Sequence, residues 1–336
     1  MNLSKNTRTG HLRLKGKRGD IMDENKIKHR GRFSQVIIYL GKLFRMFIYQ
    51  NDWKVFPMAA VISGLVCFVV GKNLFKTQEG TLIGTFALAC ICIWNGFFNS
   101  IQVICRERAI IKREHRSGMH ISAYVTAHMI YQAFLCIGQT IITLIVCRIT
   151  RVSFPTESLI TVWPIVDIGI SLFLTTYCAD MMALMISSFV HSTTTAMTIM
   201  PFMLIFQLVF SGSGFFPLDG IAQKITNVTI SKWGLTALCS LGDYNSKPMV
   251  TLWNAISKLQ NMEMNGQKPI AEFMSFAQDN GWKEQILEWC GRQNQNIIYS
   301  FDADNVIKCW GFLLLFIFIY ACIAVICLEF IDKDKR

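Results

Sequence analysis

The sequence predicts an all-α membrane protein with six transmembrane helices, because of its composition and the clustering of its apolar residues. Hydrophobic residues make up 52% of the chain and charged residues only 16%, whereas about 25% of the residues in a soluble domain are charged. The apolar residues also gather in blocks of roughly the 20 residues that cross a bilayer. The six blocks lie at residues 55–71, 80–104, 121–147, 163–190, 195–211 and 304–331.

Residues 1–32 precede these blocks and are polar, basic and rich in glycine. They contain ten Lys and Arg residues against three acidic residues, and they lack a hydrophobic signal region. A segment of this composition cannot bury a core. We therefore expect a disordered cytoplasmic tail, with docking on a partner or on anionic lipid as the alternative.

Residues 33–50 show a different pattern, in which apolar side chains recur at three- and four-residue steps. These positions are Phe33, Val36, Ile37, Leu40, Leu43, Phe44 and Phe47. The pattern predicts an amphipathic helix that lies in the membrane interface with its apolar side in lipid.

The six apolar blocks differ in strength. The first and the fifth are the shortest and contain Pro57 and Pro201, although neighbouring helices can shelter a kinked span. The last is the strongest, with twenty uncharged residues in a row at 309–328. Residues 51–219 thus hold five spans, and residues 304–336 hold the sixth span and a short tail.

Basic residues predict the orientation of the spans. An even number of spans places both termini on one side, and the loop 105–119 on that side carries five Lys and Arg residues. The two short loops on the other side carry Lys72, Lys76, Arg148 and Arg151. Because positive charge favours the inner side, we expect both termini to be cytoplasmic and the protein to lie in the cell membrane. The net charge of +11 then faces anionic lipid, and no nucleic acid partner is expected.

The loop 105–119 is the most informative stretch of the chain. Its interior, residues 107–116, is highly charged and contains no Pro or Gly, so a short helix along the membrane face is expected. The sequence E-R-A-I-I-K-R-E-H-R-S-G-M, with T-A-H-M-I-Y-Q-A-F soon after, resembles the first cytoplasmic loop of ABC-2 type permeases, specifically the G subfamily of ABC transporters. The family pattern is close to E-R-x-x-x-x-R-E-x-x-S-G-M/Y, and this chain meets every position.

Two further blocks carry the same resemblance. Residues 179–221 resemble the fourth and fifth spans of the family, in particular those of its bacterial branch, and residues 229–238 resemble the segment just outside the fifth span. Together with the order of the spans, the resemblance covers roughly residues 33–330. It implies a G-subfamily, type V exporter-like fold with a connecting helix at 33–50.

The resemblance also implies that residues 105–118 form a coupling helix that docks on an ATPase subunit. The residues implicated in coupling are Glu107, Arg108, Arg113, Glu114, His115, Arg116, Ser117 and Gly118. Of these, we expect Glu107, Arg113 and Glu114 to make the docking contacts. The implied partners are an ATPase subunit, which would bind ATP and Mg, and a second permease subunit in a homo- or heterodimer.

By the same resemblance, the substrate path runs between the second and fifth spans of two subunits. The candidates for lining it are Asn95, Phe98, Gln207 and Phe210. Polar groups inside a span face either a cavity or another helix, and for any single residue both interpretations stay open. In relatives, a bulky apolar pair after Phe-Ser-Gly forms an external plug. This chain has Ser213 and Gly214 there, followed by Phe215 and Phe216, so the phenylalanines are the candidate gate.

Residues 220–303 are largely polar and predict an extracellular lid with two short amphipathic helices, near 249–261 and 269–292. Cys239 and Cys290 are a candidate external disulfide, and the spacing of the other cysteines suggests no metal site. Asp180 lies midway along the fourth block, where a charge is costly. A structural hydrogen bond is the preferred role for Asp180, since a proton relay would need ionisable partners.

The chain contains no G-x-x-x-x-G-K-[ST] motif, so no P-loop is predicted, and no nucleophile and base are suitably placed for hydrolysis. We therefore expect no enzyme activity and no bound cofactor for the chain alone. The predicted function is the permease subunit of an ATP-driven exporter with a separate ATPase. The alternatives are a non-transporting scaffold or sensor subunit and, less favoured, an ion-driven carrier that uses Asp180.

Overall fold

The computed structural model describes residues 31–49, 52–214, 220–263 and 267–330, and every regular element within them is a helix. This confirms the all-α fold for the described part of the chain. The predicted tail, up to residue 30, lies outside the described residues, as do Phe215 and Phe216 of the candidate gate.

Helices form at all six apolar blocks: α3 (Val55–Val70), α4 (Gln78–Ser100), α6 (Ile121–Ile149), α7 (Pro164–Phe189), α8 (Thr193–Val209) and α14 (Ala303–Glu329). All but α8 are long and apolar enough to cross a membrane, α3 together with the preceding turn η1 (Asp52–Lys54). α8 has 17 residues with Pro201 inside it, and no turn before it extends it to the 18 or more residues of the other five. The structure therefore shows five candidate spans, and the sixth crossing stays a prediction.

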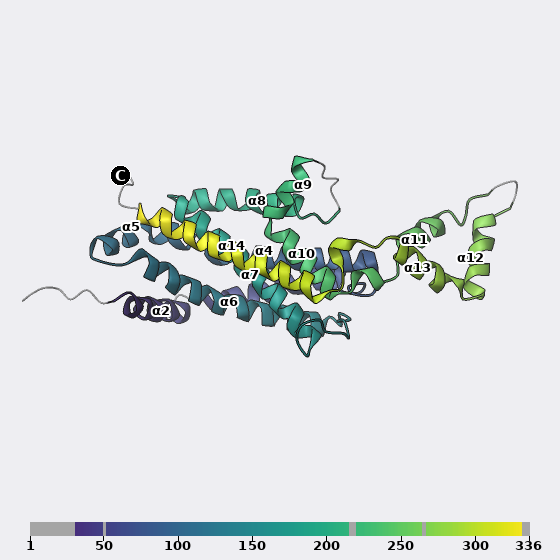
Figure 1. Ribbon diagram of the computed structural model, residues 1–336, viewed down its shortest axis with the longest axis horizontal. Coiled ribbons are helices and arrows are strands. Elements are labelled where there is room, and N and C mark those ends of the chain that lie inside the picture. The colour runs from purple at the N-terminus through teal and green to yellow at the C-terminus, as the bar shows by residue number, and fades with distance from the viewer. Residues whose placement is uncertain (1–30, 50–51, 215–219, 264–266, 331–336) are drawn as a thin grey trace, which may run out of the picture.

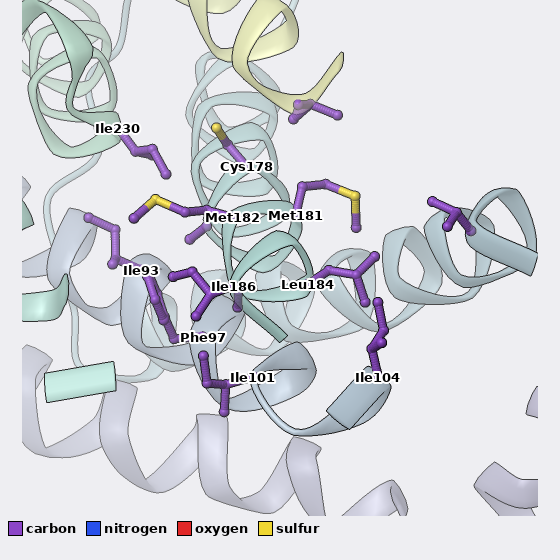
Figure 2. Close-up of a cluster of buried hydrophobic side chains, with 14 of the residues drawn as sticks. Ile93, Phe97, Ile101, Ile104, Cys178, Met181, Met182, Leu184, Ile186 and Ile230 are labelled. Atoms are coloured by element: carbon purple, nitrogen blue, oxygen red, sulfur yellow. The ribbon is translucent and has the colours of Figure 1, made fainter. Parts of the chain in front are cut away.

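α4 and α7 form the centre of the bundle (Figure 1). Figure 2 shows Ile93 and Phe97 of α4 beside Met182 and Ile186 of α7 in one buried cluster. The two backbones approach closely at Gly96, where an added Cβ would overlap the carbonyl oxygen of Thr176. Small residues at such crossings allow the close packing that holds helices together in membranes.

α2 (Arg32–Tyr49) is the amphipathic helix that the sequence predicts, and it packs along α6. Leu43 is buried against α6, and the ring of Phe44 meets Tyr131 edge to face at 5.7 Å. Other apolar positions such as Phe33 and Ile37 are exposed. Its apolar residues are therefore divided between a contact with α6 and the outside, instead of all facing lipid.

The polar segment 220–303 separates into two parts. Its helices are α9 (Ile221–Ile225), η2 (Thr226–Val228), α10 (Ile230–Leu241), η3 (Tyr244–Ser246), α11 (Thr251–Lys258), α12 (Pro269–Asp279), α13 (Trp282–Gln293) and η4 (Ile297–Tyr299). α11, α12 and α13 extend beyond one end of the bundle, opposite α5 (Val103–Arg116) and the end of α14 (Figure 1). α10 instead packs against α4, α7 and α14, with nearly all of its residues buried. This apolar helix does not stand out in the sequence, because the segment as a whole is polar.

Two side chains at the start of α4 attach α11 and α13 to the bundle. The carboxylate of Glu79 accepts hydrogen bonds from the amides of Val250, at 3.0 Å, and Thr251, at 2.7 Å. Gln78 donates to the carbonyl oxygen of Gly291 at 2.8 Å. The two bonds to Glu79 satisfy amides at the N-terminus of α11 that have no partner within the helix, and the bond from Gln78 holds the last turn of α13.

Glu79→Ala is expected to loosen α11–α13 without unfolding the bundle. A hydrogen bond to a charged group contributes about 1.5–3 kcal/mol, so cleavage at Lys258 by trypsin should rise about tenfold. Mass spectrometry of the digest measures this, with Glu157→Ala, an exposed position between α6 and α7, as the control. Equal cleavage in the wild type and both variants would contradict the attachment.

Candidate functional site: the charged helix α5

The helix α5 ends in the sequence Ser-Gly-Met for a structural reason. Gly118 has a φ of 99°, in the left-handed region that favours glycine. The amide of Gly118 donates to the carbonyl oxygen of His115 at 3.0 Å, and the amide of Met119 donates to the carbonyl oxygen of Glu114 at 3.1 Å. This is a glycine C-cap that stops a helix, and it turns the buried Met119 into the core. Part of the sequence motif is therefore a helix stop.

The inner face of α5 is locked to α7. The hydroxyl of Ser187 accepts hydrogen bonds from the amides of Ile104 and Cys105, both at 3.1 Å. The guanidinium of Arg108 donates to the carbonyl oxygen of Ser188 at 2.8 Å, where α7 ends. The amides at the start of α5 are thus satisfied by a side chain of α7, and a carbonyl oxygen at the end of α7 is satisfied by a side chain of α5. Such backbone groups at helix ends have no partner within their own helix.

Glu107 points into the protein and joins three helices. Its Oε2 atom lies 3.5 Å from the Nζ atom of Lys42 on α2 and accepts a hydrogen bond of 3.5 Å from the hydroxyl of Tyr124 on α6. The side chain of Glu107 is only 11% exposed. An enclosed carboxylate is poorly placed to touch a docking protein, so the expected docking role of Glu107 does not fit this structure.

Glu114 also bonds to α2, because its Oε2 atom accepts a hydrogen bond of 2.9 Å from the hydroxyl of Tyr39. Burial and the neighbouring carboxylate raise the pKa of Tyr39 well above its ordinary value. The phenol therefore stays protonated and donates at any physiological pH. Glu114 has an intramolecular partner and is not a simple docking contact.

A third link from α2 fixes the end of α5. The amide group of Gln35 donates to the carbonyl oxygen of Gly118 at 3.3 Å and accepts from the backbone of His120 at 2.9 Å. His115 lies with its Nδ1 atom 3.2 Å from the carbonyl oxygen of Met119. Together these bonds make α2, α5 and the start of α6 one connected unit.

The outer face of α5 is a basic surface with an apolar centre. Its exposed positions follow helical spacing: Arg106, Ala109, Ile110, Arg113, Arg116 and Ser117. Ile110 is 40% exposed, and arginines stand before and after it along the helix. An apolar contact rimmed by arginines suits a protein interface, where Arg is enriched and charge sets orientation.

Of the three docking contacts expected from the sequence, only Arg113 lies on this outer face. Ile110 was missed because apolar residues on a charged helix are usually assigned to the core. The helical spacing from Arg106 through Ile110 to Arg113 is the signal that could have found it.

The four candidates for the substrate path do not share one environment in the structure. Gln207 is buried, and its Oε1 atom accepts from the amides of Ile230, at 2.9 Å, and Ser231, at 3.2 Å. It thereby caps the N-terminus of α10. Phe210 packs on Phe206 at 4.9 Å between ring centroids.

The other two path candidates lie on α4. Asn95 is buried, whereas Phe98 is partly exposed and lines a pocket between α4 and α6. The amide of the neighbouring Asn99 pairs in both directions with that of Gln139, at 2.9 and 3.0 Å. Of the four path candidates, Gln207 therefore bonds to another helix, and Asn99, next to the candidate Phe98, does the same.

The described part of the candidate gate forms a tight turn. Ser211 donates to the hydroxyl of Ser213 at 3.0 Å, and Gly212 and Gly214 adopt positive φ values of 68° and 80°. Ser213 is buried and Gly214 is exposed. Tyr299 of η4 donates to the carbonyl oxygen of Gly212 at 3.4 Å, which ties this turn to the chain before α14.

One expectation about buried groups is wrong in this structure, and a second stays a prediction. Cys239 and Cys290 are free thiols, and the Sγ atom of Cys239 lies instead 3.0 Å from the hydroxyl of Thr85, because α10 is drawn into the bundle. Both carboxylate oxygens of Asp180 are buried, and the polar side chain that interacts with them is Ser100 of α4, so the structural hydrogen bond of Asp180 stays a prediction. The close approach of α4 at Gly96 encloses the residue.

Comparison with known proteins agrees with this architecture. Residues 37–241 match the family model of the ABC-2 type transporter. The chain is also 25% identical, over 154 residues, to an ABC transporter ATP-binding/permease protein of Mycobacterium tuberculosis. That match covers 45% of this chain and 18% of the relative, so the chain spans only a small part of that protein. Because the family match extends over more than half of the chain, and because the described residues include five candidate membrane-spanning helices, the protein belongs to the ABC-2 type transporter family as a multi-pass membrane permease.

Proposed function

We propose that the chain is the permease subunit of an ATP-driven exporter, that it dimerises to form the translocation path, and that α5 couples it to ATPase subunits. The observation that carries this proposal is the division of α5 into two faces. Its inner face is bonded to α2, α6 and α7, and its outer face presents Ile110 between arginines. ATP and Mg would be bound by the ATPase partner.

The geometry supports a simple route for transmitting motion. α4 and α5 follow each other with only residues 101 and 102 between them, so a displacement of α5 acts directly on α4. Because hydrogen bonds join α5 to α2 and α7, these two helices are expected to move together with α5. Closure of the ATPases on nucleotide could then shift the centre of the bundle as a unit, which is how rigid elements propagate domain closure.

The relative from Mycobacterium tuberculosis is named for both ATP binding and permease functions, which supports an ATPase as the partner of this chain. Both termini would then face the cytoplasm, with α5 on the same side as the ATPase. The lid formed by α11–α13 would stand outside the cell membrane.

The test is affinity purification of the full chain from its native membrane in mild detergent, with partners identified by mass spectrometry. We expect an ATPase subunit to copurify with the wild type, and Arg113→Glu to lower its recovery by about tenfold, as for a central interface residue. Arg45→Glu, the same charge change at an exposed position on α2, is the control.

The outcome would also identify the type of complex. A second permease in the wild-type eluate would establish a heterodimer. No ATPase with the wild type, in a preparation that preserves other complexes, would contradict the proposal and leave a scaffold or sensor subunit.

A further inference from the structure

A polar pocket lies where η1, α4, α5 and α6 meet, with a volume of about 180 Å³. Asp52 of η1 and Arg106 of α5 both line it. Among the residues that the structure describes, these two side chains do not form an ion pair with each other. The pocket therefore presents one negative and one positive group to the same space.

The pocket also holds a buried acceptor without a partner. Gln132 is 1% exposed, lines the pocket, and its Oε1 atom makes no hydrogen bond. A buried carbonyl oxygen left unpaired costs free energy, so a donor at this position is expected. The carboxylate of Asp52 is a second acceptor in the pocket. Two acceptors in one small space suit an ammonium group, which has several N–H donors and no acceptor.

The residues of α5 that line the pocket suit an anion. Arg106 presents a guanidinium, which matches the oxygens of a phosphate in geometry and charge. Gln102, immediately before α5, also lines the pocket and adds an amide that can donate. Asp52, Gln132, Arg106 and Gln102 are together complementary to a molecule that carries an ammonium and a phosphate, and that is neutral in total.

Size and position indicate where such a molecule comes from. About 180 Å³ is close to the roughly 150 Å³ cavity that encloses benzene and below the roughly 300–1,000 Å³ of pockets for drug-sized ligands. Asp52 lies immediately before α3, at the start of a candidate span. Only 17% of the apolar stretch that includes α3 is buried. Most of α3 therefore faces the lipid, and the pocket at its start lies next to the lipid.

We propose that this pocket binds the headgroup of a phospholipid with a primary ammonium, of the phosphatidylethanolamine class, one per chain. The phosphate contacts Arg106 and Gln102, and the ammonium contacts Asp52 and Gln132. The acyl chains lie along the exposed apolar side of α3, whose exposed residues include Met58, Val61, Leu65 and Phe68. Such a lipid holds η1 against α5 through Arg106, which stands at one end of the outer face of α5.

The chemistry predicts a sharp preference among lipids. The quaternary ammonium of phosphatidylcholine has no N–H group, so it cannot donate to the buried Oε1 atom of Gln132. Phosphatidylglycerol has no cation and leaves the carboxylate of Asp52 unpaired. Only the primary ammonium satisfies both acceptors.

The experiment reconstitutes the full chain in nanodiscs that contain one of these three lipids in a common matrix lipid. Native mass spectrometry then counts the lipids retained as detergent is used to strip the protein. We expect one phosphatidylethanolamine per chain, retained about tenfold better than phosphatidylcholine, and a higher thermal unfolding midpoint in its presence.

Variants locate the site. Asp52→Asn and Arg106→Met should each lower retention of phosphatidylethanolamine by about tenfold, and Lys54→Met, an exposed position in the same turn, should not. Equal retention of phosphatidylcholine by the wild type would overturn the proposal even if the variants fail to fold. Equal retention by all variants would place the lipid elsewhere, and stabilisation by free phosphoethanolamine without retained lipid would make the ligand a soluble one.

Discussion

Gly96→Val is expected to destabilise the fold strongly. A Cβ at this position would overlap the carbonyl oxygen of Thr176 and lie 2.7 Å from the amide nitrogen of Asp180 and 2.9 Å from the Cβ of Ala179. Two of these three are backbone atoms, which cannot turn away as a flexible side chain can. We expect a loss of about 3 kcal/mol, at the upper end for overpacking, from a total stability of about 5–15 kcal/mol.

Size-exclusion chromatography of the fluorescently tagged protein, together with its thermal unfolding midpoint in detergent, measures this effect. Gly64→Ala and Gly311→Ala are matched controls, because nothing lies within 4 Å of a Cβ at either position. Both glycines are inside helices, so each alanine substitution should raise the free energy of unfolding of the protein by about 0.5–1 kcal/mol. A Gly96→Val protein as stable as these controls would show that α4 and α7 do not cross at this residue.

Glu107→Ala is expected to give the second large effect, by weakening the attachment of α5 to α2 and α6 while its outer face stays intact. The ion pair with Lys42, which is 36% exposed, contributes at most about 1 kcal/mol. The larger loss comes from Tyr124, whose nearly fully buried hydroxyl would lose its acceptor at a cost of about 1–3 kcal/mol.

The functional consequence distinguishes docking from transmission. The ATPase should copurify with Glu107→Ala as with the wild type, but its hydrolysis should no longer respond to transported substrate. Hydrogen exchange should show faster opening of α2. Glu107→Gln, which keeps an acceptor for Tyr124, should retain more stability than Glu107→Ala. Loss of the ATPase from the Glu107→Ala preparation would instead make Glu107 a docking contact.

The positions of the helices could be predicted from the sequence because they depend on local properties. A continuous apolar block of 309–328 can only be accommodated as one long buried or membrane-spanning helix, and the structure forms α14 there. The stop at Gly118 is equally local, since it depends on the conformational freedom of one glycine. These features determined the all-α fold and the place of α5.

Which face of each helix turns inward could not be predicted, because it depends on partners far away in the chain. Charged residues lie on both faces of α5, so its sequence does not indicate which face is inner. Glu107 faces inward because Lys42 of α2 and Tyr124 of α6 provide its partners there. Likewise, Gln207 resembles any polar residue in a span until α10 brings its unpaired amides to it.

The sequence by itself thus determined where the long apolar helices lie, which stretches are apolar enough to enter a membrane, and that the charged helix stops before Gly118. Only the tertiary structure decided that α10 belongs to the bundle, that Cys239 and Cys290 are not joined, and that Ile110 rather than Glu107 faces outward. The physical reason is that helix formation is set by neighbours in the chain, whereas burial and pairing are set by contacts between segments distant in sequence.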